Sequence, residues 1–182
     1  MKILIMRGSF PSSEFNWFDW LGLELKTLGY EVILEDFPSD KWEDVNSLGE
    51  KNIDRFKPLQ SLTSWENFFR QNILHKIQNE SFIFVGHSIA PVFFLHMLEK
   101  YNLTITLAVF VSPFFNLDYK KDQWQFYPVN KTFYKSDFDF SKAISDKDHL
   151  VERLRKQKYY DVLHGLENVE LIQASASFLS DK

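Results

Sequence analysis

The chain has 182 residues, of which 45% are hydrophobic and 25% charged, and this composition excludes a disordered chain and predicts one buried core. The net charge of -4 and the lack of a prominent run of basic residues exclude a nucleic-acid partner. The absence of cysteine excludes disulfides, zinc–thiolate sites and a cysteine nucleophile. The apolar runs are too short for a membrane span or a signal peptide. We expect one domain over residues 1–182, in the cytoplasm, with no membrane partner.

The first elements alternate between strand and helix. Residues 2–6 are a short apolar run typical of a buried strand, and turn-forming residues follow over 8–13. Apolar residues at helical spacing predict a helix over 15–28, and Gly29 stands where a C-cap glycine belongs. A second strand is predicted over 31–35.

The middle of the chain begins with a polar segment, 39–62, which is typical of a loop with a short helical piece. Ser64 and Asn67 form a weak capping pattern that predicts a helix from there to about Ile77. The remaining predicted elements are a strand over 81–85, a helix over 91–101, a strand over 104–111, an excursion over 112–140, a helix over 148–163 and a strand over 169–172.

This alternation predicts the α/β class, with a doubly wound, mostly parallel sheet and helices on both faces in three layers. The high phenylalanine content predicts an aromatic core, because these side chains bury large areas. Ligands of such sheets bind at the carboxyl ends of the strands.

The strongest local motif is Gly86-His87-Ser88-Ile89-Ala90, which joins an apolar strand to a helix. The nucleophile turn of α/β-hydrolases occurs in this context, with small residues two positions before and after the serine. Gly86 and Ala90 fill those positions, so Ser88 is the predicted nucleophile. The alternative is a serine N-cap in an ordinary loop. We expect His87 to point elsewhere, because successive residues in a tight turn diverge.

A second motif, Arg7-Gly8-Ser9-Phe10, follows the first predicted strand. In this fold such a loop supplies one backbone N–H of the oxyanion hole, and the residue after the nucleophile supplies another. The predicted donors are therefore Ser9 or Phe10, together with Ile89. The alternative is a surface turn. The chain has neither the HExxH pattern of a metal site nor a glycine-rich nucleotide loop, and we expect no metal and no cofactor.

Several separate segments carry a resemblance to a known family: Gly8-Ser9, Trp17-Phe18-Asp19-Trp20-Leu21, Val85-Gly86-His87-Ser88, Val109-Phe110-Val111-Ser112, Asn130-Lys131-Thr132-Phe133 and Asp137-Phe138-Asp139-Phe140. Over about residues 1–142 the chain resembles the YdeN-like, retinoblastoma-binding protein nine-type small serine hydrolases of the α/β-hydrolase superfamily. The resemblance implies a Ser-Asp-His triad in that chain order, with small carboxylic esters as model substrates.

The tail resembles this family less closely, and we expect a divergent, shortened C-terminal part. Residues 145–151 fit the Ser-x-x-Asp-x-x-Val pattern around the family's acid, which makes Asp148 the candidate; alternatively, Asp148 opens a helix. Ser177 stands where the resemblance places the catalytic histidine. His149, next to Asp148, is the candidate substitute base.

Two functions follow from these observations. The first is a serine hydrolase acting on a small ester or a similar acyl substrate. The second is a catalytically impaired protein of the same fold that binds a small molecule or a protein partner, because a serine hydroxyl without a base is a weak nucleophile.

Overall fold

The computed structural model describes residues 1–10, 17–111, 113 and 124–134. Their centre is a four-stranded sheet in the order β2-β1-β3-β4, in which every neighbouring pair is parallel. The strands are β1 (Lys2–Met6), β2 (Glu31–Leu34), β3 (Phe82–His87) and β4 (Ile105–Val111). The predicted α/β class with a parallel sheet is confirmed.

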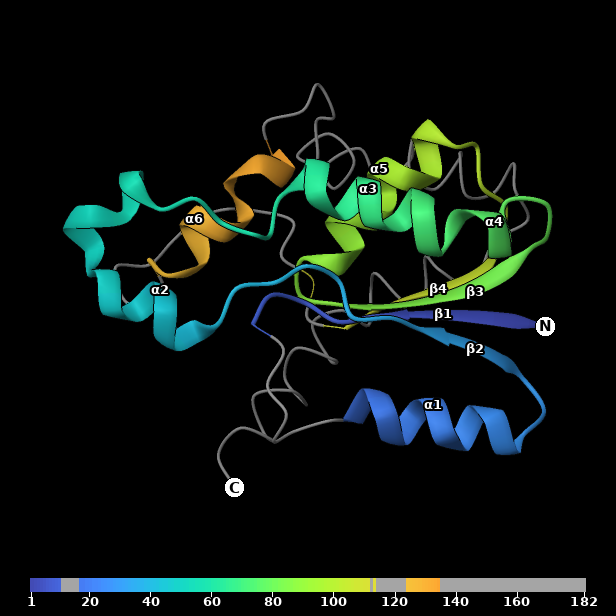
Figure 1. The fold of residues 1–182 in the computed structure, drawn as a ribbon. Coiled ribbons are helices and arrows are strands. Elements are labelled where there is room, and N and C mark those ends of the chain that lie inside the picture. Colours follow the sequence, from blue (N-terminus) through green and yellow to red (C-terminus); the bar gives the residue numbers. More distant parts are fainter. Residues whose placement is uncertain (11–16, 112, 114–123, 135–182) are drawn as a thin grey trace.

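Helices cover both faces of the sheet (Figure 1). One face carries α1 (Trp17–Thr27), and the other carries α3 (Leu62–Asn72), α4 (Leu74–Ile77) and α5 (Ala90–Lys100). The carboxyl ends of the strands point away from the N label of Figure 1, toward a lobe formed by α2 (Trp42–Leu48), η1 (Glu50–Arg55) and α6 (Phe126–Asn130). A further turn, η3 (Lys131–Tyr134), follows α6.

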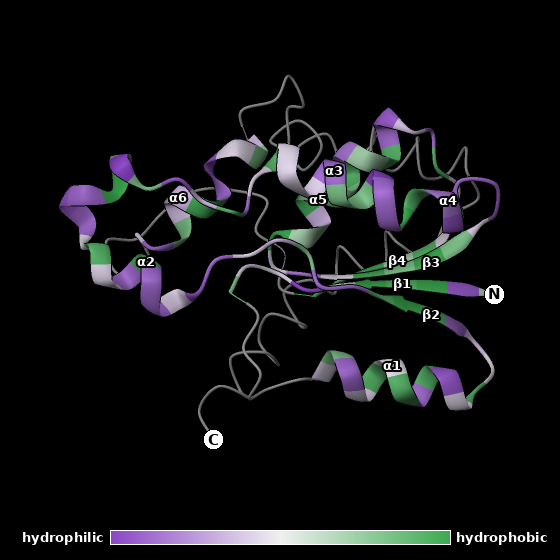
Figure 2. Ribbon diagram, viewed as in Figure 1, coloured by the Kyte–Doolittle hydropathy of each residue, from purple (hydrophilic) through white to green (hydrophobic). Residues whose placement is uncertain are grey.

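Two hydrophobic cores lie on opposite sides of the sheet, because successive strand side chains point to opposite faces. From β1, Leu4 and Met6 enter the larger core beside α3 and α5, whereas Ile3 and Ile5 enter the smaller core beside α1. Figure 2 shows the strands as hydrophobic between these helix layers. The larger core is rich in phenylalanine, as predicted, and its fully buried phenylalanines are Phe69, Phe82, Phe84, Phe93, Phe94 and Phe133. Burial of each such side chain contributes about 1.5–3 kcal/mol.

The helix predicted to start at Ser64 begins earlier. Ser61 is its N-cap: the Ser61 hydroxyl accepts a hydrogen bond from Ser64 N, and Ser64 Oγ accepts one from Ser61 N. Ser64 thus occupies the third helical position of a capping box, where Glu or Gln is more usual, and this hid the true start. The predicted continuous helix to Ile77 is also interrupted at Ile73, between α3 and α4.

Other predictions have mixed outcomes. The predicted glycine stop after α1 is confirmed, because Gly29 has a φ of 85°. The segment 39–62 holds α2 and η1, which is more helix than predicted. The elements predicted over 148–163 and 169–172 lie outside the described residues, so the single domain stays a prediction. Among the described helices, none has both the length and the apolar character needed to cross a membrane.

Candidate functional site

The candidate site lies where the strand order of the sheet reverses. From β1 the chain passes to β2 on one side, and it later returns to β3 on the other side of β1. The carboxyl ends of β1 and β3 are therefore neighbours from which the chain departs in opposite directions. In open α/β sheets ligands bind outside the strand ends at such a switch point. The two sequence motifs at Gly8 and Ser88 follow these two strands.

Ser88 has an unusual backbone at the end of β3. Its φ is 61°, in the left-handed region, which costs a residue other than glycine about 1–2 kcal/mol. Ser88 N donates a hydrogen bond to Val111 O at 3.1 Å, so β4 supports the turn. The N-cap of α5 is Ile89, and no side chain caps this helix end. Ser88 is thus not the N-cap serine of an ordinary loop, which was the alternative reading of the motif.

Glycines make the sharp turn sterically possible. A Cβ atom added to Gly8 would lie 2.5 Å from Ser88 Cβ and 3.0 Å from Ser88 Oγ, so the loop after β1 touches the serine side chain through this glycine. A Cβ added to Gly86 would lie 2.5 Å from Phe84 Cζ and 3.2 Å from Pro91 Cδ. The predicted need for a small residue at position 86 is confirmed, and Gly8 is a second such residue that the motif did not reveal.

His87 faces away from Ser88, as predicted. Its ring packs edge-on against Trp17 at 6.2 Å and Phe18 at 5.8 Å between ring centroids, on the α1 side of the sheet. Burial lowers the pKa of His87, so the neutral ring is favoured. Among the described residues no hydrogen bond joins an imidazole to Ser88 Oγ; His96 Nε2, for example, pairs with Phe133 O at 2.9 Å.

The predicted oxyanion residues converge on this turn. Gly8 places the loop of Ser9 and Phe10 beside Ser88, and Ile89 stands at the N-terminus of α5. The N-terminus of a helix carries a partial positive charge that favours an anion. Phe10 is itself left-handed, with a φ of 53°. The loop and the helix end therefore lie near the same serine, and their role as oxyanion donors stays a prediction.

A buried polar cluster holds Ser9. Ser9 Oγ donates to Asn130 Oδ1 at 2.9 Å, and Gln60 Nε2 donates to Ser9 Oγ and to Asn130 Oδ1, both at 2.7 Å. Gln60 and Asn130 are 1% and 2% exposed. We did not predict either residue, because Gln60 lies in the polar segment and Asn130 in the excursion. Asn130 belongs to one of the segments that carry the family resemblance, but no sequence pattern joined it to Gln60 or Ser9.

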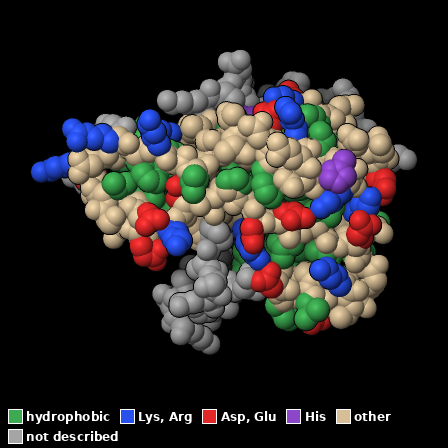
Figure 3. Space-filling view, in the orientation of Figure 1, with side chains coloured by type: hydrophobic (Ala, Val, Ile, Leu, Met, Phe, Trp, Pro, Cys, Tyr) green, Lys and Arg blue, Asp and Glu red, His purple; other side chains and the backbone are tan. Residues whose placement is uncertain are grey.

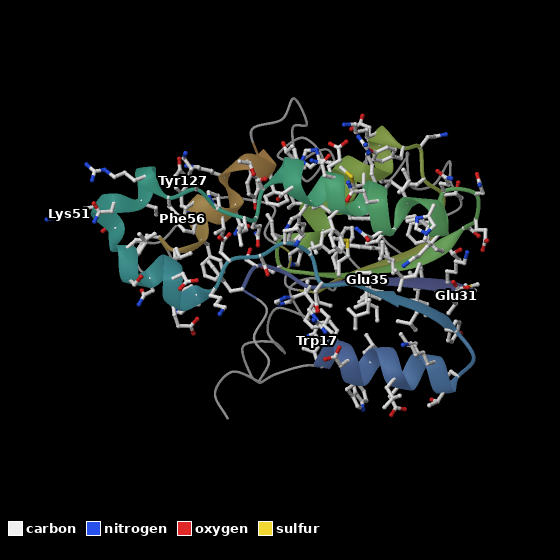
Figure 4. The ribbon with its side chains drawn as sticks, viewed as in Figure 1. Trp17, Glu31, Glu35, Lys51, Phe56 and Tyr127 are labelled. Carbon is white, nitrogen blue, oxygen red and sulfur yellow. The ribbon has the colours of Figure 1, made fainter. Side chains whose placement is uncertain are left out.

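Aromatic side chains of the lobe surround Phe10. Its ring centroid lies 5.2 Å from that of Trp42 and 5.4 Å from that of Phe126, both edge-on. Figure 4 places Tyr127 and Phe56 in the same lobe, whereas Trp17 lies across the sheet at the start of α1. Figure 3 shows hydrophobic side chains reaching the surface of this lobe. The chain therefore presents aromatic groups next to the switch point.

The remaining predicted site residues are not among those that the structure describes. Asp148, His149 and Ser177 fall outside the described residues, so their roles stay predictions. Within the part of the chain that the structure describes, no three His, Asp or Glu side chains are grouped to hold a metal ion.

A search of solved structures finds a likeness to the ydeN gene product from B. subtilis. The two chains are 23% identical with a TM-score of 0.50, and the match covers 79% of this chain and 64% of that chain, which is less than two thirds of its length. No protein-family model matches the sequence, and no curated protein matches it. The likeness shows that this chain has a YdeN-like fold.

Proposed function

We propose that this protein is a serine hydrolase in which Ser88 attacks the acyl carbon of a small carboxylic ester. The left-handed backbone of Ser88 carries the proposal, because such strain persists only where the surroundings enforce it and is concentrated at functional sites. The contact with Gly8 and the strand-to-helix setting are what a nucleophile turn requires. A cytoplasmic location and a small-molecule substrate belong to the same proposal.

In the proposed reaction Ser88 Oγ bonds to the acyl carbon and the ester C–O bond breaks. A general base takes the hydroxyl proton and passes it to the leaving alkoxide, which departs as an alcohol. Water then attacks the acyl-enzyme, gives one proton through the base to Ser88 Oγ, and releases the carboxylic acid. His149 is the proposed base and Asp148 its proposed partner, as the sequence suggests.

The proposed oxyanion donors are the backbone N–H of Ile89 and that of Ser9 or Phe10. Donors fixed in place before the reaction stabilise charge that develops in the transition state, and one such donor is worth about 10²–10³ in rate. The partial charge at the N-terminus of α5 acts in the same direction.

The direct test is labelling with a fluorophosphonate probe together with turnover of p-nitrophenyl acetate. We expect the wild type to be labelled and to turn over ester, and Ser88→Ala to do neither, while its circular dichroism is unchanged. Equal signals from the two proteins would reject the proposal, because they would show that the chemistry does not use Ser88.

A second candidate is a protein that binds a small molecule or a protein partner without turnover. The observation that favours it is the turn of His87 away from Ser88, together with Ser177 at the position where the family resemblance places the histidine. This candidate predicts no labelling of the wild type and a gain of labelling in Ser177→His. Robust ester turnover by the wild type would rule it out.

A further inference from the structure

The loop after β1 is held by two segments that are distant in the sequence. The Ser9 hydroxyl donates a hydrogen bond to Asn130 Oδ1 and accepts one from Gln60 Nε2. The two amide side chains also bond to each other, because Gln60 Nε2 donates to Asn130 Oδ1. Gln60 precedes α3, and Asn130 ends α6. All three contacts are thus tertiary, and they close a triangle around one loop hydroxyl.

The same helix also holds the next residue of the loop. Phe126 lies four residues before Asn130 on α6, so the two share a helix face. The ring of Phe126 packs edge-on against Phe10, whereas Asn130 bonds to Ser9. The consecutive loop residues Ser9 and Phe10 therefore both contact one face of α6.

The loop needs this support because Phe10 is in the left-handed region, with a φ of 53°. A phenylalanine keeps that backbone only where its surroundings over-determine it. Gly8 transmits the position of the loop to Ser88, since there is no room for a side chain between them.

Among the described residues, the side chain of Gln60 bonds only to Ser9 and Asn130. Asp40 fixes its backbone, because Asp40 Oδ2 accepts from Gln60 N at 3.0 Å. Its Nε2 donates twice, whereas its Oε1 is buried without a partner among the described residues. An unpaired buried acceptor is a cost to stability, and an apolar residue of this size would avoid it. The two hydrogen bonds that Nε2 donates offset the destabilising effect of the unpaired Oε1.

We propose that Gln60 and Asn130 are positioning residues that hold the Gly8–Phe10 loop, so that its backbone N–H groups face the oxyanion formed on Ser88. The inference rests on the proposed hydrolase function for its chemistry. The holding of the loop itself does not depend on turnover and can be measured separately.

Gln60→Met tests the proposal, and the chain offers a matched control in Gln125→Met. Gln125 is also buried, its Nε2 donates to Asn46 Oδ1 at 2.9 Å, and its Oε1 also lacks a partner among the described residues. The two substitutions thus remove the same kind of bond, but only Gln60 bonds to the loop. Asn130→Leu is the second variant, which keeps the test decisive if one protein fails to fold.

Two measurements are made on each protein. Fluorophosphonate labelling gives a maximal rate constant and a half-saturating probe concentration. We expect Gln60→Met and Asn130→Leu to lower the rate constant about 10- to 100-fold with the half-saturating concentration unchanged, and Gln125→Met to stay within about twofold of wild type. Backbone ¹³C chemical shifts of Phe10 report its φ, and we expect the left-handed values to be lost only in the first two variants.

The outcomes are distinguishable. Unchanged Phe10 shifts in both variants would overturn the proposal, as would equal labelling losses in Gln60→Met and Gln125→Met. If the wild type is never labelled but the Phe10 shifts respond as expected, the hydrolase function fails while the holding of the loop stands.

Discussion

Replacement of Gly8 by alanine is expected to displace Ser88 and destabilise the fold. The added Cβ would lie 2.5 Å from Ser88 Cβ and 3.1 Å from His87 O. Carbon atoms in good contact are about 3.5–4.0 Å apart, so the ends of β1 and β3 must separate by about 1 Å. The neighbouring atoms are backbone or belong to a short side chain, and they have little freedom to move aside.

A displacement of this size affects both stability and rate. Overpacking of a close-packed region costs about 1–3 kcal/mol in the free energy of unfolding. A misplacement of about 1 Å at a reacting group lowers the rate about 100-fold. Urea denaturation measures the first effect, and the maximal rate of fluorophosphonate labelling measures the second.

Gly22→Ala is the matched control for Gly8→Ala. A Cβ at Gly22 would make ordinary contacts, 3.6 Å from Leu34 Cδ2 and 3.7 Å from Val32 Cγ1. Gly22 lies within α1, where alanine is favoured over glycine by about 0.5–1 kcal/mol. We expect the control to be more stable than wild type and labelled equally fast. Wild-type labelling by Gly8→Ala would refute the contact between this loop and the serine.

Three further predictions concern the fold. Burial lowers the pKa of His87 below its ordinary 6.5, so the unfolded chain binds a proton at a higher pH than the folded chain does. The free energy of unfolding should therefore decrease as the pH falls below about 6.5, and it should decrease less steeply in His87→Phe. Urea denaturation midpoints measured across this pH range check the prediction. Ser61→Ala removes the N-cap of α3 and should cost about 1 kcal/mol, whereas the exposed Ser47→Ala should cost little. Trp65→Phe leaves Pro38 O, now bonded at 2.7 Å, without its donor and should cost about 1–3 kcal/mol in thermal or urea unfolding. An unchanged unfolding midpoint in Ser61→Ala or in Trp65→Phe would contradict the corresponding hydrogen bond. A free energy of unfolding that does not change with pH would contradict the burial of His87.

The sharp turn at Ser88 could be predicted from sequence because its determinants are local. Gly86, Ser88 and Ala90 lie within five consecutive residues, between an apolar strand and a helix. The strand β1 could likewise be predicted, because its run of apolar residues is a local property of the sequence. The start of α3 was missed because Ser61 and Ser64 both have capping chemistry, and sequence alone does not rank them.

The support of the site could not be predicted, because it depends on residues brought together by the fold. Gln60 and Asn130 bond to each other across 70 positions, and Gln60 bonds to Ser9 across 51. Neither segment has a periodic pattern that would place its polar residues. Gly8 was noted as part of a turn, but its contact with Ser88 follows from the register of β1 against β3, in which Met6 pairs with Gly86.

The strain at Ser88 gives a prediction that separates function from folding. Glycine adopts a φ of 61° freely, whereas alanine and serine do not. Ser88→Gly should therefore be more stable than Ser88→Ala, although glycine also gives the unfolded chain more freedom to lose. The left-handed backbone accounts for about 1–2 kcal/mol and that freedom for about 0.4–1 kcal/mol, so the midpoints of the two ranges put the difference at about 0.8 kcal/mol.

Urea denaturation of the two variants at neutral pH measures this difference directly. Because neither variant retains the hydroxyl, their comparison isolates the backbone from the chemistry of the side chain. A Ser88→Ala protein as stable as Ser88→Gly would mean that this residue is not left-handed in solution, and the nucleophile turn would lose its main support. If Ser88→Gly is more stable than the wild type and is not labelled, the chain keeps a serine at a position where folding alone favours glycine. This is what we expect of a residue that is retained for its hydroxyl.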